Sequence, residues 1–395
     1  MSKQIRLGII GTGNRARLYA LTARQVQGLE VTAITDKDPV RLQCFQREVA
    51  PDARICSNGS RELLSADDVD AIIISTPEPF HRTLAEEAFA EGKHVLLEKP
   101  MALTMEDCRG IVRAREKADR VLQLGFVLRY CKFYQQIRQV IRSGEIGQIM
   151  AVEACEHLAV MHGASYMRRW HRLSKNSGGF FLHKCSHDMD ILCWLTDSVP
   201  TRVSSFGDTR FFTPEKSRST HCSTCEIKDS CRYRFGGEAV FLTEADKADP
   251  SANNHDLCVF TAEKDIVDNQ VAIIEYRNGV KATFSLQLFH FTTTRKIRVT
   301  GELGQIEGDL ASNTARILFA DGRIREIDVI PDNDSAHNGG DFHLLREFRD
   351  NILHGTPPTA GYAEGLISNA IALAVDRARL QGCVVNLTDE DYRLT

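Results

Sequence analysis

The sequence has no long apolar run, since no stretch approaches the roughly 20 apolar residues that a membrane-spanning helix needs. It also has no charged-then-apolar leader, because its first apolar run is itself the strand of a nucleotide-binding motif. An excess of one charge is missing too: 49 basic and 53 acidic residues give a formal net charge of -4. These absences argue against a membrane or a nucleic acid as partner. We expect a cytoplasmic protein whose partners are small molecules or copies of itself.

The chain is long enough, at 395 residues, for two domains of ordinary size. Its twelve cysteines would suggest disulfides in a small secreted protein. In a long chain without a leader, most of them are better interpreted as reduced core residues.

The motif that says most about ligands lies at the N-terminus. An apolar strand at 4–10 leads directly into Gly11-Thr12-Gly13-Asn14-Arg15-Ala16 and then into a helical stretch. Gly11 permits a tight turn, Gly13 lets the backbone approach a pyrophosphate, and Ala16 lets the helix pack on the strand with its N-terminus toward the phosphates. A second apolar strand, 29–35, ends in Asp36, where a carboxylate accepts hydrogen bonds from an adenosine ribose. The motif predicts an NAD site. Asp36 favours NAD over NADP by repelling a 2′-phosphate, although the adjacent Lys37 could offset this.

The order of elements predicts the architecture. Up to residue 126, short apolar strands alternate with amphipathic helices, which is typical of a doubly wound, parallel Rossmann sheet. The expected strands are 5–10, 30–35, 71–75, 94–97 and 121–124, with helices at 79–91 and 105–117. From 127 to 340 we expect an α+β domain with a large, open, mostly antiparallel sheet, because a helix at 133–143 is followed by hairpin patterns. Its strands are 148–156, 268–276, 280–288, 295–300 and 316–319, with turns at 277–280 and 320–323. In 341–395, helices at 341–354 and 363–381, the latter stopped by Gly382, should pack back toward the Rossmann domain.

The strand at 94–97 ends in Glu98-Lys99-Pro100, and ligands bind at the carboxyl ends of parallel strands. Together with the N-terminal motif, these residues resemble the family of glucose-fructose oxidoreductase, inositol dehydrogenase and MocA (Gfo/Idh/MocA). The resemblance spans nearly the whole chain except about 200–265. It includes Ser75-Thr76-Pro77, His81, Gly178-Gly179, His187-Asp188-Met189-Asp190, the segments 300–304 and 337–341, and the last long helix.

The resemblance implies roles for particular residues. Lys99 and His187 would flank the reacting carbinol, with Lys99 touching both substrate and cofactor. Oxidising a secondary alcohol does need a base for the hydroxyl proton and a cation beside the developing alkoxide. Asp190, three residues after His187 on an expected helix, could orient the imidazole. The alternative is a helix-capping group at 186–188 with no catalytic role. The residues implied to hold the cofactor are Ser75, Thr76, Pro77, His81, Glu98 and Arg129.

One position departs from the family pattern. Many family dehydrogenases have an acidic residue four positions before the active-site histidine, and here that position is His183. His183 either takes over substrate binding or a proton relay, or is an ordinary polar residue at a helix entrance.

Two further segments carry open hypotheses. Segment 166–175 contains four cations and no acid, so it could recognise an anionic substrate group or simply form a solvated loop or subunit contact. Its candidates, with Tyr166 and Trp170 as substrate contacts, are Arg168, Arg169, Arg172 and Lys175. The thiols of Cys222, Cys225 and Cys231, with His255 and Cys258 downstream, could hold a structural zinc ion or remain unligated.

The leading hypothesis is an NAD-dependent oxidoreductase acting on a secondary hydroxyl of a sugar, sugar acid or cyclitol. Two alternatives remain. One is an NAD-dependent glycosidase, known in the same broad family, in which transient sugar oxidation permits elimination of the leaving group, with His183 and Tyr166 as extra acid or base. The other is an NAD-binding sensor without turnover, against which the presence of both Lys99 and His187 argues. A homodimer or homotetramer formed through the open sheet is expected.

Overall fold

The computed structural model describes residues 4–235 and 254–394. Its N-terminal part is a six-stranded, wholly parallel sheet in the order β3-β2-β1-β4-β5-β6. The strands are β1 (Ile5–Ile10), β2 (Leu29–Thr35), β3 (Arg54–Ile55), β4 (Ala71–Ile74), β5 (His94–Leu97) and β6 (Leu122–Leu124). Buried aliphatic runs such as β4, where all four residues are buried, form this sheet because helices cover both faces. The doubly wound fold predicted from the sequence is confirmed.

The helices between these strands follow the expected alternation. They are α1 (Asn14–Ala23), α2 (Pro39–Val49), α3 (Ser60–Leu64), α4 (His81–Ala90) and α5 (Met105–Ala118), with 3₁₀ turns η1 (Glu78–Phe80) and η2 (Val127–Tyr130). Asp38 accepts hydrogen bonds from the Val40 and Arg41 amides at the start of α2, and Thr104 accepts one from Asp107 at the start of α5. These caps explain where the two helices begin.

The second part is built on a nine-stranded sheet in the order β14-β13-β12-β11-β7-β10-β9-β8-β15. Its pairs are antiparallel except that of β7 and β10. The predicted turns are confirmed, with Gly279 at φ +91° and Gly322 at φ +87°, a conformation that glycine adopts at little cost. The strands are β7 (Ile149–Ala159), β8 (Pro200–Asp208), β9 (Asn269–Tyr276), β10 (Lys281–His290), β11 (Lys296–Gly301), β12 (Gly304–Asp309), β13 (Thr314–Phe319), β14 (Ile324–Glu326) and β15 (Val385–Asn386).

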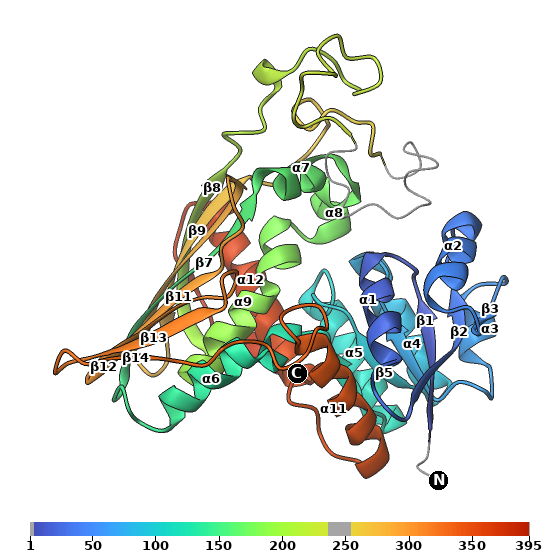
Figure 1. Ribbon diagram of the computed structural model, residues 1–395, viewed down its shortest axis with the longest axis horizontal. Coiled ribbons are helices and arrows are strands. Elements are labelled where there is room, and N and C mark those ends of the chain that lie inside the picture. Colours follow the sequence, from blue (N-terminus) through green and yellow to red (C-terminus); the bar gives the residue numbers. More distant parts are fainter. Residues whose placement is uncertain (1–3, 236–253, 395) are drawn as a thin grey trace.

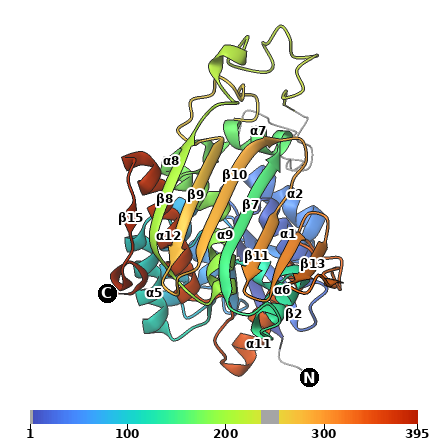
Figure 2. The same ribbon diagram turned by 90° about the vertical axis from the view of Figure 1, so that its left-hand side faces the viewer.

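One face of this sheet is covered by helices and the other is open. Figure 2 shows the uncovered strands facing the viewer with the helices behind them. The covering helices include α6 (Lys132–Arg142), α9 (Phe180–Thr196) and α12 (Tyr362–Gln381), and α9 lies between the two sheets (Figure 1). The short elements of this part are α7 (Val160–Arg168), η3 (Trp170–Arg172), α8 (Ser174–Ser177) and η4 (Pro214–Lys216).

The C-terminal helices join the two parts. Helix α11 (Gly340–His354) packs against α1 and η2, and its Leu344, Leu345 and Phe348 belong to the core of the parallel-sheet part. Helix α12 contacts α9 and β8 on one side and α5 on the other. Gly382 ends α12 in a left-handed conformation, as predicted, and α13 (Asp389–Tyr392) follows β15. None of the helices in the described ranges is long and apolar enough to cross a membrane.

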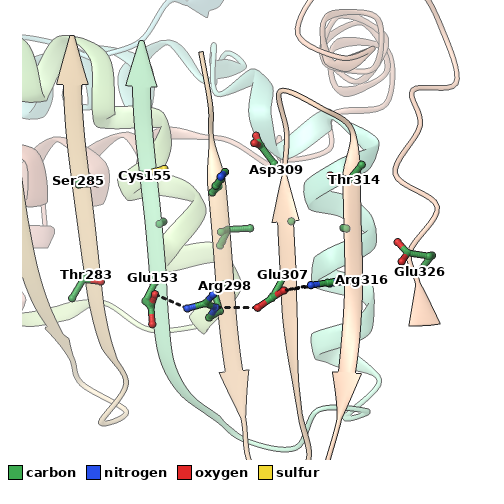
Figure 3. Close-up of a pocket in the computed structure, with 15 residues that line it drawn as sticks. Glu153, Cys155, Thr283, Ser285, Arg298, Glu307, Asp309, Thr314, Arg316 and Glu326 are labelled. Carbon is green, nitrogen blue, oxygen red and sulfur yellow. Dashed lines mark hydrogen bonds and ion pairs between the residues drawn. The ribbon is translucent and has the colours of Figure 1, made fainter. Parts of the chain in front are cut away.

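The open face carries a row of alternating charges across four strands (Figure 3). Arg298 Nη1 lies 3.1 Å from Glu153 Oε2, and its Nε lies 3.3 Å from Glu307 Oε1. Arg316 Nη2 lies 3.0 Å from Glu307 Oε2. Farther along the same sheet, apolar side chains remain exposed: Phe206 on β8 and Val271 and Ile273 on β9.

Candidate functional site

The Gly-rich turn between β1 and α1 has the geometry of a phosphate cradle. Gly11 has φ +88°, and a Cβ there would lie 3.0 Å from the Thr76 amide nitrogen, so only glycine fits. Gly13 has φ -77°, and a Cβ there would meet no atom within 4 Å. The backbone at Gly13 therefore faces open space at the N-terminus of α1, where helix amides attract an anion. These residues fit the pyrophosphate of a dinucleotide.

Asp36 stands at the carboxyl end of β2, next to this turn. Its Oδ2 accepts hydrogen bonds from the Thr12 amide at 2.6 Å and the Thr12 hydroxyl at 2.9 Å, and its Oδ1 accepts one from the Asp38 amide. The carboxylate is thus held beside the cradle, where it suits a ribose hydroxyl. The neighbouring Lys37 ammonium lies 5.8 Å from the centre of the Phe80 ring.

The turn after β4 has two roles. Ser75 donates a hydrogen bond to the Gly11 carbonyl at 2.9 Å, and Ser75 and Thr76 line a cleft beside the cradle. His81, predicted to bind the cofactor, does not line that cleft. Its Nδ1 lies 3.0 Å from the Pro100 carbonyl and its Nε2 lies 3.0 Å from the Thr76 carbonyl. His81 therefore ties two loops together.

Glu98 is a buried anion that lines the cleft. Its Oε1 accepts hydrogen bonds from Arg15 Nε at 2.5 Å and from the Tyr19 hydroxyl at 2.6 Å, and Arg15 also pairs with Asp341. Burial opposes ionisation, but Arg15 and Lys99 lower the pKa of the Glu98 carboxyl below its usual value. Glu98 thus stays charged and fixes Arg15 at the start of α1.

Lys99 points from the end of β5 toward α9. Its Nζ donates a hydrogen bond to the main-chain carbonyl of His183 at 2.8 Å. Burial lowers the pKa of Lys99 to about 8, while Glu98 and Glu78 oppose this and Lys184 adds to it. An amine with this pKa can hold or release a proton near neutral pH.

His183 lines the cleft and is paired with Glu78, which the sequence analysis did not single out. Its Nδ1 forms a hydrogen bond with Glu78 Oε1 on η1, and its ring lies among Tyr166, Trp170 and Phe180. This pair joins residues 105 positions apart, and sequence spacing carries no signal for such a contact.

His187 lies one turn farther along α9, also on the cleft. Burial, and next Lys99, lower its pKa well below 6.5, so it is neutral. The expectation that Asp190 orients this imidazole is wrong. Asp190 instead accepts two hydrogen bonds of 2.7 Å from Arg129. Arg129, expected near the nicotinamide, is buried in this pair and does not line the cleft.

A buried ionic cluster forms the floor of the cleft and was also missed. Lys184 Nζ lies 3.1 Å from Glu156 Oε1, and Arg295 Nε lies 2.5 Å from Glu156 Oε2 and 3.2 Å from Asp188 Oδ1. Lys184 and Arg295 line the cleft. Burial raises the pKa of Asp188 to about 7. The two cations are each paired with a carboxylate, and their partners are Glu156 on β7 and Asp188 on α9.

The basic segment does not reach the cleft through its arginines. Arg168 is fully buried and donates hydrogen bonds to the carbonyls of Tyr233 and His255, and Arg172 donates one to the Glu263 carbonyl. The predicted role of these cations in clamping a substrate anion is therefore wrong for Arg168 and Arg172, whose side chains bind main-chain carbonyls instead. Arg169 and the exposed Lys175 do not line the cleft either. From the same segment, Tyr166 and Trp170 do.

The zinc hypothesis finds no support in the described part of the chain, where no three His, Cys, Asp or Glu side chains come together to hold a metal ion. The cysteines have other neighbours. Cys222 Sγ lies 3.9 Å from Arg168 Nη1, and Cys258 Sγ lies 3.3 Å from the Ser217 hydroxyl. Cys225 and Cys231 are unbonded thiols in the same loop region.

The cleft as a whole has a volume of ≈ 660 Å³, within the range of small-molecule sites, about 300–1,000 Å³. One wall holds the cradle residues Asn14 and Arg15, and the opposite wall holds His183, His187 and Trp170. A dinucleotide bound at α1 would thus reach the carboxyl ends of β4 and β5, where the titratable groups lie.

Comparison with known proteins agrees with this geometry. Residues 5–126 match the NAD-binding Rossmann fold of the Gfo/Idh/MocA oxidoreductase family, and residues 138–387 match its C-terminal alpha/beta domain. The putative oxidoreductase YteT of Bacillus subtilis is 26% identical, covering 88% of this chain and 87% of its own. Inositol 2-dehydrogenase of Ralstonia nicotianae is 28% identical over 66% of this chain and 81% of its own.

Solved structures share the fold. Aldose-aldose oxidoreductase of Caulobacter crescentus superposes with a TM-score of 0.75 at 20% identity, covering 98% of this chain and 100% of that one. A levoglucosan dehydrogenase in complex with NADH and L-sorbose gives a TM-score of 0.79 at 15% identity, covering 98% and 99%.

Proposed function

Because this chain belongs to the Gfo/Idh/MocA family of oxidoreductases, we propose that it is an NAD-dependent dehydrogenase that oxidises a secondary hydroxyl of a sugar, sugar acid or cyclitol. The proposal rests on one observation: the cradle residues at the start of α1 line the same cleft as Lys99, His183 and His187. Relatives named as inositol 2-dehydrogenases support this substrate class.

The residues of the cradle would hold NAD. The amides at the start of α1 would bind the pyrophosphate, and Asp36 would accept hydrogen bonds from the adenosine ribose. A fixed carboxylate at Asp36 repels a 2′-phosphate, which favours NAD over NADP. When bound, the oxidised nicotinamide supplies the acceptor for a hydride.

The proton chemistry would be carried out by Lys99 and by the histidines of α9, which line the same cleft. Oxidation breaks the O–H and C–H bonds of a carbinol, so a base must take the hydroxyl proton as the hydride leaves. Lys99, whose pKa is about 8, would stabilise the developing alkoxide or share its proton. His187, neutral and buried beside Lys99, would contact the same hydroxyl.

The substrate pocket suits a neutral polyol better than a sugar acid. Trp170 and Tyr166 offer aromatic faces on which the apolar side of a sugar ring can lie. The cations on the floor, Lys184 and Arg295, already contact carboxylates. A carboxylate on the substrate would have to compete with Glu156 and Asp188 for them.

We also propose that the protein forms a homodimer or homotetramer through the open face of the nine-stranded sheet. Its charge row alternates in sign, so it is complementary to itself when turned by a two-fold rotation. The exposed apolar residues of β8 and β9 would be buried in such an interface.

The function is tested by measuring nicotinamide absorbance with NAD or NADP and a panel of aldoses, sugar acids, cyclitols and aryl glycosides. Formation of one NADH per ketone product supports the proposal. Release of an aglycone without net NADH would support the glycosidase instead. Tight NAD binding without turnover on any member of the panel would favour a sensor.

A further inference from the structure

Glu78 and His183 form a buried pair on the cleft. Glu78 is 4% exposed, and its Oε1 is engaged by His183 Nδ1. Its other oxygen, Oε2, is buried without a hydrogen-bond partner among the residues described. A carboxylate removed from water with half of its acceptors unused costs folding free energy. Such a group is retained where it serves a function.

The pairing determines what each nitrogen of the imidazole can do. A carboxylate only accepts hydrogen bonds, so Nδ1 of His183 must carry a proton toward Glu78. In the neutral ring, Nε2 then holds the lone pair, and the structure gives it no hydrogen-bond partner within the described chain. Since His183 lines the cleft, its basic nitrogen is available to a ligand there.

His187 has no comparable support. Its Nδ1 is buried without a hydrogen-bond partner in the described residues, and the carboxylate three positions later is occupied by Arg129. Of the two cleft histidines that α9 carries, only His183 contacts a carboxylate that fixes its tautomer and stabilises its protonated form. His337, another cleft histidine, is paired with Asp341, which also contacts Arg15 at the start of α1.

We infer that His183 Nε2 is the base that takes the substrate hydroxyl proton and that Glu78 is its positioning residue. This inference rests on the proposed dehydrogenase function. The O–H bond breaks as an N–H bond forms on Nε2, the C–H electron pair leaves as hydride for the oxidised nicotinamide, and the C–O bond becomes a carbonyl. The resulting imidazolium faces Glu78, which stabilises its charge.

Other groups around His183 set its acidity. Burial lowers its pKa, Glu78 opposes this, and Lys99 and Lys184 lower it further. His171 on η3 faces the same ring, and burial lowers its own pKa well below 6.5, so it adds no charge at neutral pH. Tyr166 on α7 also touches the ring. Glu78 is the sole carboxylate that contacts His183 in the described residues.

The test is the variant Glu78→Gln, which keeps the shape but removes the charge. We expect a fall in kcat of roughly 10²-fold with the KM nearly unchanged, as for loss of an effective proton-transfer group. Removing the anion lowers the pKa of the imidazole, so the acid limb of the kcat/KM profile should move to lower pH. Glu86→Gln is the matched control, because Glu86 pairs with Arg82 on the surface of α4. Normal kcat and an unmoved profile in Glu78→Gln would overturn the inference.

A second variant separates catalysis from structure. His183→Asn keeps a donor toward Glu78 but has no basic nitrogen, so adding Glu78→Gln to it should cause no further loss of kcat. Independent, additive losses would contradict the pairing.

A third readout does not need turnover. Imidazole ¹⁵N spectra of the intact protein, with the His183 signals identified by their absence in His183→Asn, should show the Nδ1–H tautomer in the wild type and a mixture in Glu78→Gln. If the wild type oxidises no substrate, the proposed function is refuted, but this spectrum still shows whether Glu78 fixes the tautomer of His183. A mixed tautomer in the wild type would refute the inference whatever the activity.

Discussion

Lys99 is the residue in which stability and chemistry conflict most directly. Its pKa is lowered from 10.5 to about 8 by burial, which means that the folded chain disfavours its charged form. A shift of this size corresponds to about 3 kcal/mol at about 1.4 kcal/mol per unit. Part of this free-energy cost is offset because the Lys99 side chain lines the cleft, which is open to solvent.

We therefore predict that Lys99→Met abolishes turnover yet raises the free energy of unfolding by roughly 1–2 kcal/mol at pH 7. Between about pH 8 and 10.5 the unfolded wild type binds more protons than the folded one, so the wild type gains stability and the difference should shrink. Urea unfolding at pH 7 and at pH 9.5 measures this, with the exposed Lys117→Met as control. A wild type more stable than the variant at pH 7 would refute the prediction.

At the scale of single residues, side chains that belong to a short local motif could be identified from the sequence. The residues that contact them across the fold could not. The positions of Gly11, Asp36, Glu98 and Lys99 follow from short spacings within one strand–turn–helix unit. Glu78 was missed because its partner lies 105 residues away. Asp190 was assigned to the wrong neighbour, since sharing a helix face with His187 does not determine which other element that face meets.

The strand–turn–helix element at 5–23 offers a comparison of two glycines with different roles. Gly11→Ala forces a side chain into a left-handed conformation and against the Thr76 amide, so it should lower the free energy of unfolding by about 1–2 kcal/mol or more. Gly13→Ala meets neither obstacle, so it should change the free energy of unfolding by less than about 1 kcal/mol.

The same Gly13→Ala methyl group projects into the cradle, however, and should weaken NAD binding at least tenfold. Urea unfolding and isothermal titration with NAD measure both effects. Unaltered NAD affinity in Gly13→Ala would show that the cradle does not approach the dinucleotide.

Elements with clear periodicity were predicted to within a few residues, whereas β8 and β12 of the second sheet were not predicted. In β8, Ser205 is buried while Phe206 is 67% exposed, so the usual alternation of apolar and polar residues is reversed. In β12, Ile306 is the one large apolar residue among glycines and polar side chains. Both strands owe their conformation to pairing with neighbours.

At the scale of the whole molecule, the open sheet face determines how copies can associate. We predict that the wild type sediments as a dimer or tetramer of the 44.2 kDa chain. Ile273→Glu, which places a charge on the exposed apolar part of this face, should convert it to a monomer. Sedimentation equilibrium measures the masses. Val40→Glu, equally exposed on α2 of the other part, should leave the assembly unchanged.

A monomeric wild type would contradict the assignment of this face, and so would an Ile273→Glu variant that keeps the wild-type mass.

The two-part architecture could be predicted because it depends on the order of local elements. The side-chain pairs within the cleft could not, because its walls come from η1, α7, α9 and the loop before β11, which are far apart in the sequence. Their contacts form only when the two sheets are joined through α9 and α12.

The central claim is that this cleft transfers a hydride from a carbinol carbon to NAD. The direct measurement uses a neutral cyclitol or aldose that is a substrate and carries deuterium at the carbinol carbon, followed by mass spectrometry of the nicotinamide product. The account predicts one deuterium on each reduced nicotinamide formed and a ketone at the labelled carbon. Reduced nicotinamide without deuterium, or release of the label to water, would contradict it.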